Sequence, residues 1–310
     1  AGTAYATHGI NTIPFFTYYS MFGLQRVGDL VWAAADMSCK GFLVGATAGR
    51  TTLAGEGLQH QDGNSHVLAY PIPNLVAYDP AFAYELAVII RDGIYRMYEK
   101  RENVFYYITI MNENYPQPNM PDVPNIKEGI LKGMYKFKQS DLKNAKASAN
   151  LLGSGTILNE AIKAAEILEK DYKVATNVWS VTSYKNLHLD AQETERWNML
   201  HPDQELKVPY IAQVTKDENG IFVSASDYVQ FLSDAIAKWL PSKLHSLGTF
   251  GFGRSEGRSS LRDFFEVDAK HIVYATLYSL MKEGKIKIDV VKKAQKDLGI
   301  NPDKPNPAKS

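Results

Sequence analysis

Between Thr12 and Met111 the chain alternates short β-rich runs with longer stretches of helical periodicity. Four runs are rich in aromatic and β-branched residues, which predicts strands: "TIPFFTYYS", "GFLVGAT", "NLVAY" and "NVFYYITIMN". Two stretches between them, "LQRVGDLVWAAADMS" and "AFAYELAVIIRDGIYRMYEK", place apolar residues at helical spacing. We expect Asp79 and Pro80 to begin the second helix as an N-cap and N1 pair. This alternation predicts an α/β fold with a mostly parallel sheet covered on both faces.

A proline-rich segment then interrupts the pattern. Residues 112–126, "NENYPQPNMPDVPNI", contain four prolines, which remove hydrogen-bond donors and restrict the backbone, so we expect a linker. Strand and helix patterns resume after it, from "ANLLGSG" and "TILNEAIKAAEILEKDY" to two helices at about 269–284 and 289–298. The sequence therefore predicts two α/β domains, residues 1–120 and 121–310.

Charge and cysteine content exclude several classes of protein. Lys and Arg number 34, as do Asp and Glu, so this 310-residue chain has no electrostatic footprint for nucleic acid or an anionic membrane. Cys39 is the only cysteine, which excludes an intramolecular disulfide framework and indicates a reducing compartment. We expect it to be a small buried residue. Since no run approaches the ~18 apolar residues of a membrane helix, and no signal peptide is recognisable, we expect a cytoplasmic protein.

The segment "GRTTLAGEGLQHQDGNSH", residues 49–66, fits neither helical nor strand periodicity. It follows the predicted strand "GFLVGAT", and α/β proteins bind ligands at the carboxyl ends of parallel strands. Its four glycines let a ligand approach the main chain, and His60 could donate or accept a proton. The alternative is a surface loop whose histidines only bond to neighbours. His60, Asp62 and His66 could also suggest a metal site, but their spacing on a loop is not diagnostic.

Aromatic residues gather in "PFFTYYSMFG", residues 14–23. A packed core strand is the default interpretation, because aromatic side chains mostly serve burial. The alternative is a surface on which a flat heteroaromatic ligand stacks, with Tyr19 and Phe22 beside the glycine. Other catalytic motifs are missing from the sequence: "GATAGR" lacks both the GxGxxG spacing and the P-loop lysine, and no GxSxG nucleophile motif occurs.

Arg254, Arg258 and Arg262 follow one another at intervals of four residues in "GRSEGRSSLR". On a helix this spacing places three cations on one face. Such a face suits an acidic partner or pairs between subunits, although a solvated helix face is the more common outcome.

Several motifs together resemble a known family. They are "GEGLQHQDG", "YDPAFAYELAVIIRDGIYRMY", "YYITIMNENYPQPNMP", "ERWNMLHP" and "GFGRSEGRSSLRDFFEVDA". In this order they resemble the homodimeric bacterial pyruvate dehydrogenase, the decarboxylating, acetyl-transferring component of the pyruvate dehydrogenase complex. The resemblance runs from end to end and implies the latter part of a thiamine-diphosphate pyrimidine-binding domain, followed by a transketolase C-terminal-like domain.

The resemblance implies thiamine-diphosphate-dependent decarboxylation of pyruvate, with acetyl transfer to the lipoyl domain of a dihydrolipoamide acetyltransferase. It implies that Tyr19 and Phe22 flank the aminopyrimidine ring, that Glu56 lies near the cofactor, and that His60 acts on the substrate or the lipoyl group. Mg²⁺ is bound in this family by a further domain with a GDG motif, which this sequence does not contain. The glutamate that activates the aminopyrimidine should lie shortly before Ala1.

On this basis we expect a partial chain that is inactive alone and completes its site in a homodimer. Two alternatives stay open: a dimerisation or docking module without catalysis, and a transketolase-type enzyme acting on sugar phosphates. "ERWNMLHP" favours the pyruvate enzyme over the second. The sequence departs from the family at Gln61 and Phe250, where acidic residues are usual, which puts in doubt only the local charge.

Overall fold

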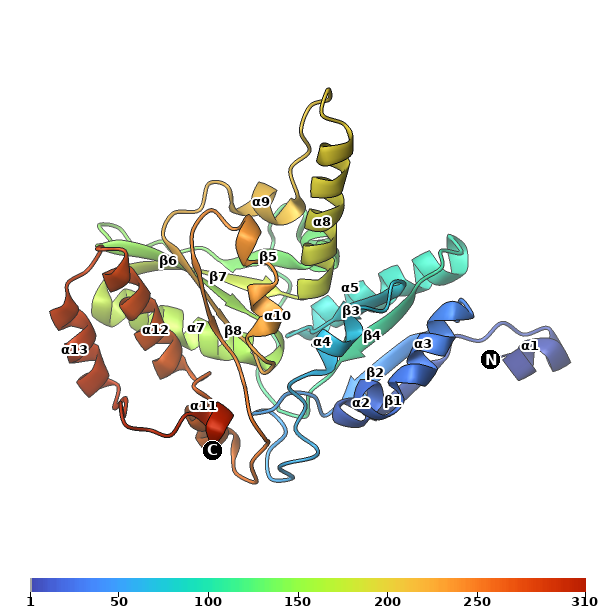
Figure 1. Ribbon diagram of the computed structural model, residues 1–310, viewed down its shortest axis with the longest axis horizontal. Helices are drawn as coiled ribbons and strands as arrows, with labels where there is room; N and C mark the ends of the chain where they lie inside the picture. The colour runs from blue at the N-terminus through green and yellow to red at the C-terminus, as the bar shows by residue number, and fades with distance from the viewer. Residues whose placement is uncertain (1) are drawn as a thin grey trace.

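The computed structural model describes residues 2–310, which form two β-sheets in adjoining halves of the molecule (Figure 1). The first sheet is parallel throughout, with the strand order β1-β2-β4-β3. Its strands are β1 (Phe15–Tyr19), β2 (Phe42–Ala46), β3 (Leu75–Tyr78) and β4 (Phe105–Thr109). The aromatic strand β4 is buried along its whole length, whereas β1 is an edge strand that exposes Phe16 and Tyr19.

Helices precede, follow and connect these strands. They are α1 (Gly2–His8), the 3-10 turn η1 (Ser20–Phe22), α2 (Gly23–Arg26), α3 (Gly28–Asp36), α4 (Ser65–Ala69), α5 (Ala83–Ile94) and the π-helical turn η2 (Tyr95–Glu99). Because the strands are parallel, their carboxyl ends meet at one edge of the sheet. The chain segments that follow β1 and β2 therefore lie next to each other.

The second sheet has the order β5-β7-β6-β8-β9, in which only β5 is antiparallel to its neighbour. Its strands are β5 (Met134–Lys138), β6 (Ala147–Gly153), β7 (Val174–Val181), β8 (Ile221–Ala225) and β9 (Leu244–Leu247). Its helical segments are α6 (Ile126–Lys132), η3 (Gly155–Ile157), α7 (Leu158–Ile167), η4 (Leu168–Tyr172), α8 (Tyr184–Leu200), α9 (Tyr210–Thr215), α10 (Phe231–Asp234), η5 (Ala237–Trp239), α11 (Arg258–Phe265), α12 (Ala269–Lys282), α13 (Ile288–Asp297) and η6 (Pro307–Lys309). The predicted class, two α/β units, is confirmed.

A buried carboxylate joins the two halves. Glu85, in the first turn of α5, accepts hydrogen bonds from the hydroxyls of Tyr135 (2.7 Å) and Ser180 (2.6 Å) in the second sheet. It also accepts from the backbone N–H groups of Ala81 (2.6 Å) and Phe82 (3.0 Å). Four donors satisfy the lone pairs of a carboxylate that is fully buried, so the contact between the halves is specific.

The prediction that Asp79 and Pro80 begin α5 is wrong. The helix begins at Ala83, and the Glu85 carboxylate satisfies the N–H groups in front of it. Asp79 is instead buried between the two halves, where its carboxylate accepts a hydrogen bond of 2.6 Å from the Thr109 hydroxyl. An acidic residue before a proline looks like a cap in sequence, but here the tertiary contact uses it.

Two other expectations are corrected by the structure, and one helix appears that was not predicted. The single helix expected over "LQRVGDLVWAAADMS" is divided at Val27 into α2 and α3. Cys39, which follows the turn after α3, is exposed and not buried as expected. The longest helix, α8, was not anticipated from the sequence and projects from the body of the molecule (Figure 1).

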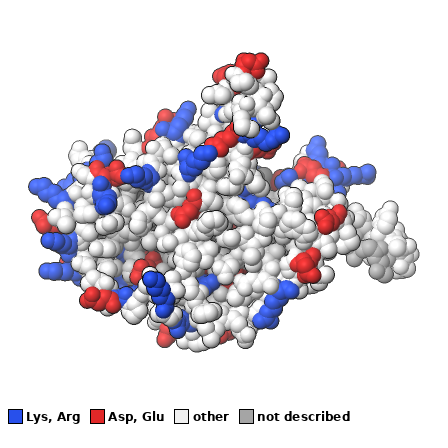
Figure 2. Space-filling view, viewed as in Figure 1, with Lys and Arg blue, Asp and Glu red and all other residues white. Residues whose placement is uncertain are grey.

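Figure 2 shows positive and negative side chains scattered over one face of the molecule, in keeping with the equal numbers of the two signs. In the part of the chain that the structure describes, no helix combines the length and the apolar character needed to cross a membrane.

Candidate active site

The four residues singled out from the sequence come together at the carboxyl edge of the first sheet. Tyr19 ends β1 and pairs in register with Ala46, at the end of β2. Phe22 follows Tyr19 in the turn η1, and the segment with Glu56 and His60 follows β2. We call residues 49–66 the His60 loop. Adjacent parallel strands thus bring two distant parts of the sequence to one place.

Three rings form the centre of this site. The His60 ring lies edge-on to Phe22, with centroids 5.0 Å apart, and edge-on to Tyr19, with centroids 5.6 Å apart. Tyr19 and Phe22 are themselves 5.6 Å apart. Tyr19 is 41% exposed, so this is not a packed core strand. The rings instead line a partly open aromatic surface.

Neighbouring residues fix the orientation of Phe22. The Arg26 guanidinium lies 4.1 Å from the centroid of its ring, a cation–π contact. The residue after Phe22 must be glycine, because a Cβ atom on Gly23 would lie 1.8 Å from the Tyr18 ring. Burial raises the pKa of Tyr18 well above its usual value, so its phenol stays neutral.

His60 is the only described histidine that lies against these rings and also faces an acid at the site. Its Nε2 is 3.7 Å from the Glu56 carboxylate, within ion-pair range but beyond hydrogen-bond length. Its Nδ1 is buried and has no hydrogen-bond partner among the described residues. The side chain keeps 26% exposure. A proton held at Nε2 can therefore reach a group bound beside the rings.

The sequence did not decide whether His60, Asp62 and His66 form a metal site on this loop. In the structure, Asp62 and His66 have other partners. The Asp62 carboxylate caps α4 by accepting from the N–H groups of Asn64 and Ser65, both at 2.9 Å. His66 is buried, with Nε2 2.9 Å from the Thr109 hydroxyl. Asp62 and His66 thus have structural partners away from His60.

A second group of possible metal ligands, Asp263, Asp268 and His271, lies near the start of α12. Lys270 already contacts Asp263 at 2.5 Å, and His271 contacts Asp268 at 2.6 Å. These local pairs account for the charges, so we assign no metal to them.

The far side of the His60 loop is bound to the second half of the molecule. The Gln61 side chain accepts from the Arg254 N–H (2.7 Å) and donates to the Leu53 carbonyl (2.6 Å). Leu58 forms a β-bridge with Gly253. Gln61 is fully buried in this contact, which explains how a neutral side chain serves at a position where an acidic one was expected.

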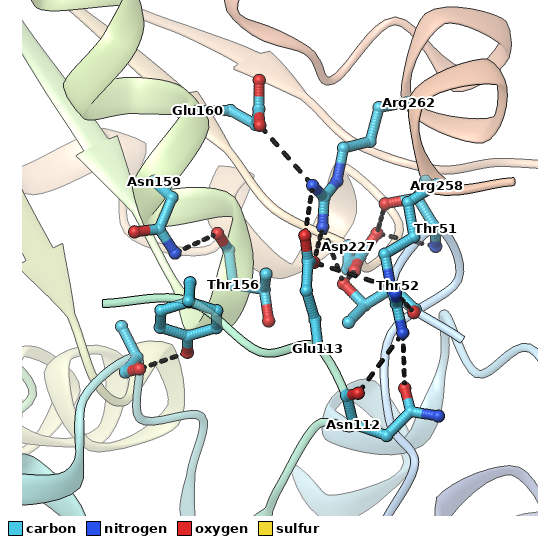
Figure 3. Close-up of polar contacts among 12 residues, drawn as sticks. Thr51, Thr52, Asn112, Glu113, Thr156, Asn159, Glu160, Asp227, Arg258 and Arg262 are labelled. Atoms are coloured by element: carbon cyan, nitrogen blue, oxygen red, sulfur yellow. Dashed lines mark hydrogen bonds and ion pairs between the residues drawn. The ribbon is translucent and has the colours of Figure 1, made fainter. Parts of the chain in front are cut away.

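The three arginines do not form the exposed cationic face that their spacing suggested. Arg262 is buried between Glu113 of the linker and Glu160 of α7, while Arg258 donates to Asn112 and, at 2.7 Å, to the Thr52 carbonyl (Figure 3). The third, Arg254, lies outside α11, with its guanidinium over the Phe264 ring. Two of the three arginines therefore hold the linker and the loop in place.

Sequence reasoning missed the residue that fastens the start of the loop. Asp227, two residues after β8, is 1% exposed and accepts hydrogen bonds from Thr51 and Thr52. The only signal was its position: an acidic residue directly after the carboxyl end of a buried strand. Its partner could not be read from the sequence, because the two segments are 175 residues apart.

Comparisons with known proteins agree with this architecture. Residues 1–118 match the family described as pyruvate dehydrogenase E1 component middle domain, and residues 133–268 match the transketolase-like C-terminal domain. The pyruvate dehydrogenase E1 component of Pseudomonas aeruginosa is 51% identical over 308 residues, which is 99% of this chain and 35% of that protein. The protein of the same name from Escherichia coli strain K12 is 52% identical over 309 residues, covering 99% of this chain and 34% of that protein.

Solved structures support the same fold at lower identity. A transketolase from Campylobacter jejuni is 19% identical with a TM-score of 0.61, and the match covers 86% of this chain and 35% of that one. A split-gene transketolase described as an inactive beta4 tetramer is 18% identical with a TM-score of 0.61, and covers 90% of this chain and 80% of that one.

The chain spans about a third of the length of the curated relatives that it matches. Over that third the match is nearly continuous, and the two family models follow each other in the order of the two sheets. Residues 1–118 therefore belong to the pyruvate dehydrogenase E1 component middle-domain family, and residues 133–268 belong to the transketolase-like C-terminal-domain family.

Proposed function

We propose that these residues form part of the active site of a thiamine-diphosphate-dependent enzyme that decarboxylates pyruvate and transfers the acetyl unit to a lipoyl group. The observation that carries the proposal is the convergence of Tyr19, Phe22, Glu56 and His60, from two separate segments, around one open aromatic surface. Thiamine diphosphate supplies the nucleophilic carbon for the decarboxylation, which no side chain supplies.

The site fits the aminopyrimidine part of that cofactor. A flat heteroaromatic ring needs an aromatic surface to stack on, and Tyr19 and Phe22 provide one beside an exposed edge of the sheet. The His60 side chain is 26% exposed, so its imidazole can contact a group that is bound beside the rings. Tyr19 and Phe22 would hold the ring, and Glu56 would lie near it.

In acetyl transfer the S–S bond of the lipoyl dithiolane breaks as one sulfur takes the acetyl unit, and the other sulfur needs a proton. We assign this proton to Nε2 of His60, whose ring is oriented by Phe22 and Tyr19 on one side and Glu56 on the other. The same nitrogen could instead protonate the oxygen of the keto group during decarboxylation. The two assignments are separated by the experiment below.

The rest of the proposal starts from the finding that the chain spans about a third of the length of its relatives. We propose that the diphosphate and Mg²⁺ are bound outside these 310 residues, that the enzyme is a cytoplasmic homodimer, and that it meets the lipoyl domain of a dihydrolipoamide acetyltransferase. We also place the boundary between its two domains near residue 120, within the linker that precedes α6. A docking module without catalysis remains the alternative that the assay must exclude.

The test uses the full-length enzyme with pyruvate, thiamine diphosphate and Mg²⁺. In a His60→Ala variant we expect acetyl transfer to lipoamide to fall by about 10²- to 10⁴-fold, the usual range for loss of a general acid, with a much smaller loss of decarboxylation measured with an artificial electron acceptor.

His201→Ala is the matched control, because His201 stacks on Trp197 in the projecting part of the molecule and not at the site. Equal losses in both assays would assign His60 to decarboxylation instead. No turnover of pyruvate by the unmodified enzyme, together with no heat on titration with thiamine diphosphate, would leave the docking module as the function.

A further inference from the structure

The His60 loop begins with a turn that encloses a carboxylate from the other half of the molecule. Asp227 Oδ1 accepts hydrogen bonds from the Thr51 N–H (2.9 Å) and the Thr51 hydroxyl (2.5 Å). Oδ2 accepts from the Thr52 hydroxyl. In Figure 3, both threonines point toward Asp227. A carboxylate that accepts three hydrogen bonds in a buried site is held firmly, since each lost bond leaves a desolvated polar group.

The turn has the shape that this carboxylate requires. Gly49 has a φ of +91°, which other residues rarely adopt, and a Cβ atom there would lie 2.4 Å from Asp227 Oδ2. The Arg50 N–H completes the enclosure by donating to the Asp227 carbonyl at 3.4 Å. The first four residues of the loop are therefore closed around one residue, Asp227, of the transketolase-like domain.

Two buried arginines lie near this acid. Arg50 is 3% exposed, and burial lowers its pKa while the negative charges of Asp62 and Asp227 oppose that shift. Arg262 donates to the Thr52 hydroxyl at 3.4 Å. Burial alone would lower its pKa, but the hydrogen bond with Glu113 and the charge of Asp227 raise it above the usual value. Among the described residues neither guanidinium pairs directly with Asp227, so the carboxylate is held by its hydrogen bonds to the loop, with the two cations nearby.

The remainder of the loop continues from this anchor to His60. The Gly55 N–H donates to the Glu256 carbonyl at 3.0 Å, and the β-bridge between Leu58 and Gly253 follows. A tight turn, in which the His60 N–H donates to the Gly57 carbonyl at 2.9 Å, then directs the imidazole toward the aromatic surface. The position of the His60 ring therefore depends on contacts with the other domain along the whole loop.

We propose that Asp227 is a positioning residue: through Thr51 and Thr52 it sets where the His60 loop starts and so places the imidazole against Phe22 and Tyr19. The inference rests on the proposed function for its catalytic consequence, but the placement of the loop itself does not depend on which reaction His60 serves. Among residues 2–310 the Asp227 carboxylate accepts hydrogen bonds from Thr51 and Thr52 alone, so its effect on His60 passes through the loop.

The primary test measures the accessibility of His60 in the full-length protein. Wild type and Asp227→Asn are treated with diethyl pyrocarbonate, and the rate of carbethoxylation of His60 is read by peptide mass spectrometry relative to that of His201. Asparagine keeps the shape of the side chain but removes its charge and replaces one acceptor oxygen with a donor. The Thr52 hydrogen bond must then reverse its direction or be lost, and the charge-assisted bonds of the loop are weakened. Because a loosened loop exposes Nδ1, we expect the His60 to His201 ratio to rise by roughly threefold or more.

A second variant perturbs the same contact from the loop side. Gly49→Ala forces a Cβ atom toward Asp227, whereas Gly55→Ala, its matched control, adds the same methyl group at a φ of +86° with no atom within 4 Å. We expect Gly49→Ala to raise the ratio as Asp227→Asn does, and Gly55→Ala to change it much less. Asp217→Asn, at an exposed acid in the same domain, should leave it unchanged.

The kinetic readout separates positioning from general destabilisation. With thermal denaturation showing folded protein, Asp227→Asn should lower kcat for the step that His60 serves by about 10- to 100-fold, the range for a displaced catalytic group, with little change in the KM for pyruvate. An unchanged His60 to His201 ratio in both Asp227→Asn and Gly49→Ala would overturn the proposal, whatever the activity. A raised ratio without a kinetic effect would confirm the placement of the loop and contradict the proposed role of His60.

Discussion

At the scale of single residues, His66 and Asp79 form a buried pair at the contact between the two halves, and this pair holds one proton. His66 Nε2 lies 4.0 Å from the Asp79 carboxylate, and both side chains are buried. Burial, opposed by hydrogen bonds from Thr109 and other hydroxyls, raises the pKa of Asp79 to about 7. Burial and the charge of Lys185 lower the pKa of His66 to about 3. Between about pH 3 and 7 the pair is therefore neutral in the folded protein, with the proton on Asp79.

This arrangement predicts how stability depends on pH. In an unfolded chain aspartate titrates near pH 3.9 and histidine near 6.5, so between about pH 4 and 6.5 the unfolded pair also holds one proton, on the histidine. In this range the folded and the unfolded protein bind the same number of protons at Asp79 and His66. The contributions of the two residues to the pH dependence of stability therefore cancel. In His66→Gln only Asp79 remains, so we expect the free energy of unfolding to fall as the pH rises from about 4 to 7, by up to about 1.4 kcal/mol per pH unit.

Asp79→Asn reverses the sign of that dependence. Only His66 then titrates, and because its folded pKa is depressed, stability should rise with pH between about 3 and 6.5. Urea unfolding of wild type and both variants at a series of pH values measures the three slopes. Parallel curves for all three proteins would show that the proton is not held on Asp79.

At the scale of elements, α8 is anchored to the first sheet by a lysine without an acidic partner. Lys185 Nζ donates to the carbonyls of Ala69 (2.8 Å), Ile72 (2.7 Å) and Leu75 (2.6 Å), around the turn between α4 and β3. The side chain is 3% exposed, and burial lowers its pKa to about 8. A cation near the start of a helix is unfavourable to the helix dipole, so the three carbonyls have to stabilise the ammonium.

Replacing Lys185 tests this anchor. Lys185→Met keeps the aliphatic chain but leaves three buried carbonyls without their donor, so we expect the free energy of unfolding to fall by about 3–5 kcal/mol. Lys216→Met is the control, because Lys216 is exposed at the neighbouring helix α9 and surface changes usually stay within about 0.5 kcal/mol. Chemical denaturation of the two variants gives both numbers, and similar losses in the two would contradict the anchor.

Helices and strands were predicted correctly where the local sequence pattern determines the secondary structure. Strands β1 to β4 and helices α12 and α13 were expected from periodicity, and the structure confirms them. It failed for α8, whose polar and apolar residues are poorly segregated around the helix, and for the start of α5, where Glu85 replaced the expected cap. Both helices begin at local caps that the periodicity does not reveal. The Ser183 side chain accepts from the Asn186 N–H at the start of α8, and Glu85 accepts from the N–H groups in front of α5.

At the scale of the whole molecule, buried polar contacts between the halves predict joint unfolding. Glu85 bonds to the second sheet, Arg262 binds Glu113 of the linker, and Asp227 binds the His60 loop. Disrupting one half would leave these groups buried and unpaired in the other, at a cost of several kcal/mol each. We expect a single calorimetric transition for residues 1–310, with a calorimetric enthalpy close to the van't Hoff enthalpy.

Arg262→Gln is the variant that should uncouple the halves, since it removes the charge that holds Glu113 and Glu160 together. We expect its transition to broaden or split in differential scanning calorimetry. Lys293→Gln, at an exposed ion pair on α13, is the control and should keep one transition. Two transitions already in the unmodified chain would contradict joint unfolding.

The sequence by itself determined the class of fold, the order of strands and helices in the first half, and the candidates Tyr19, Phe22, Glu56 and His60, because periodicity and motif are local properties of the chain. Only the tertiary structure decided that these four side chains meet, and that Asp227 from the other domain fastens the loop that carries His60. The physical reason is that a buried carboxylate, arginine or lysine must find its partners in space. Those partners lie on segments that are distant in the sequence, where no local pattern records the pairing.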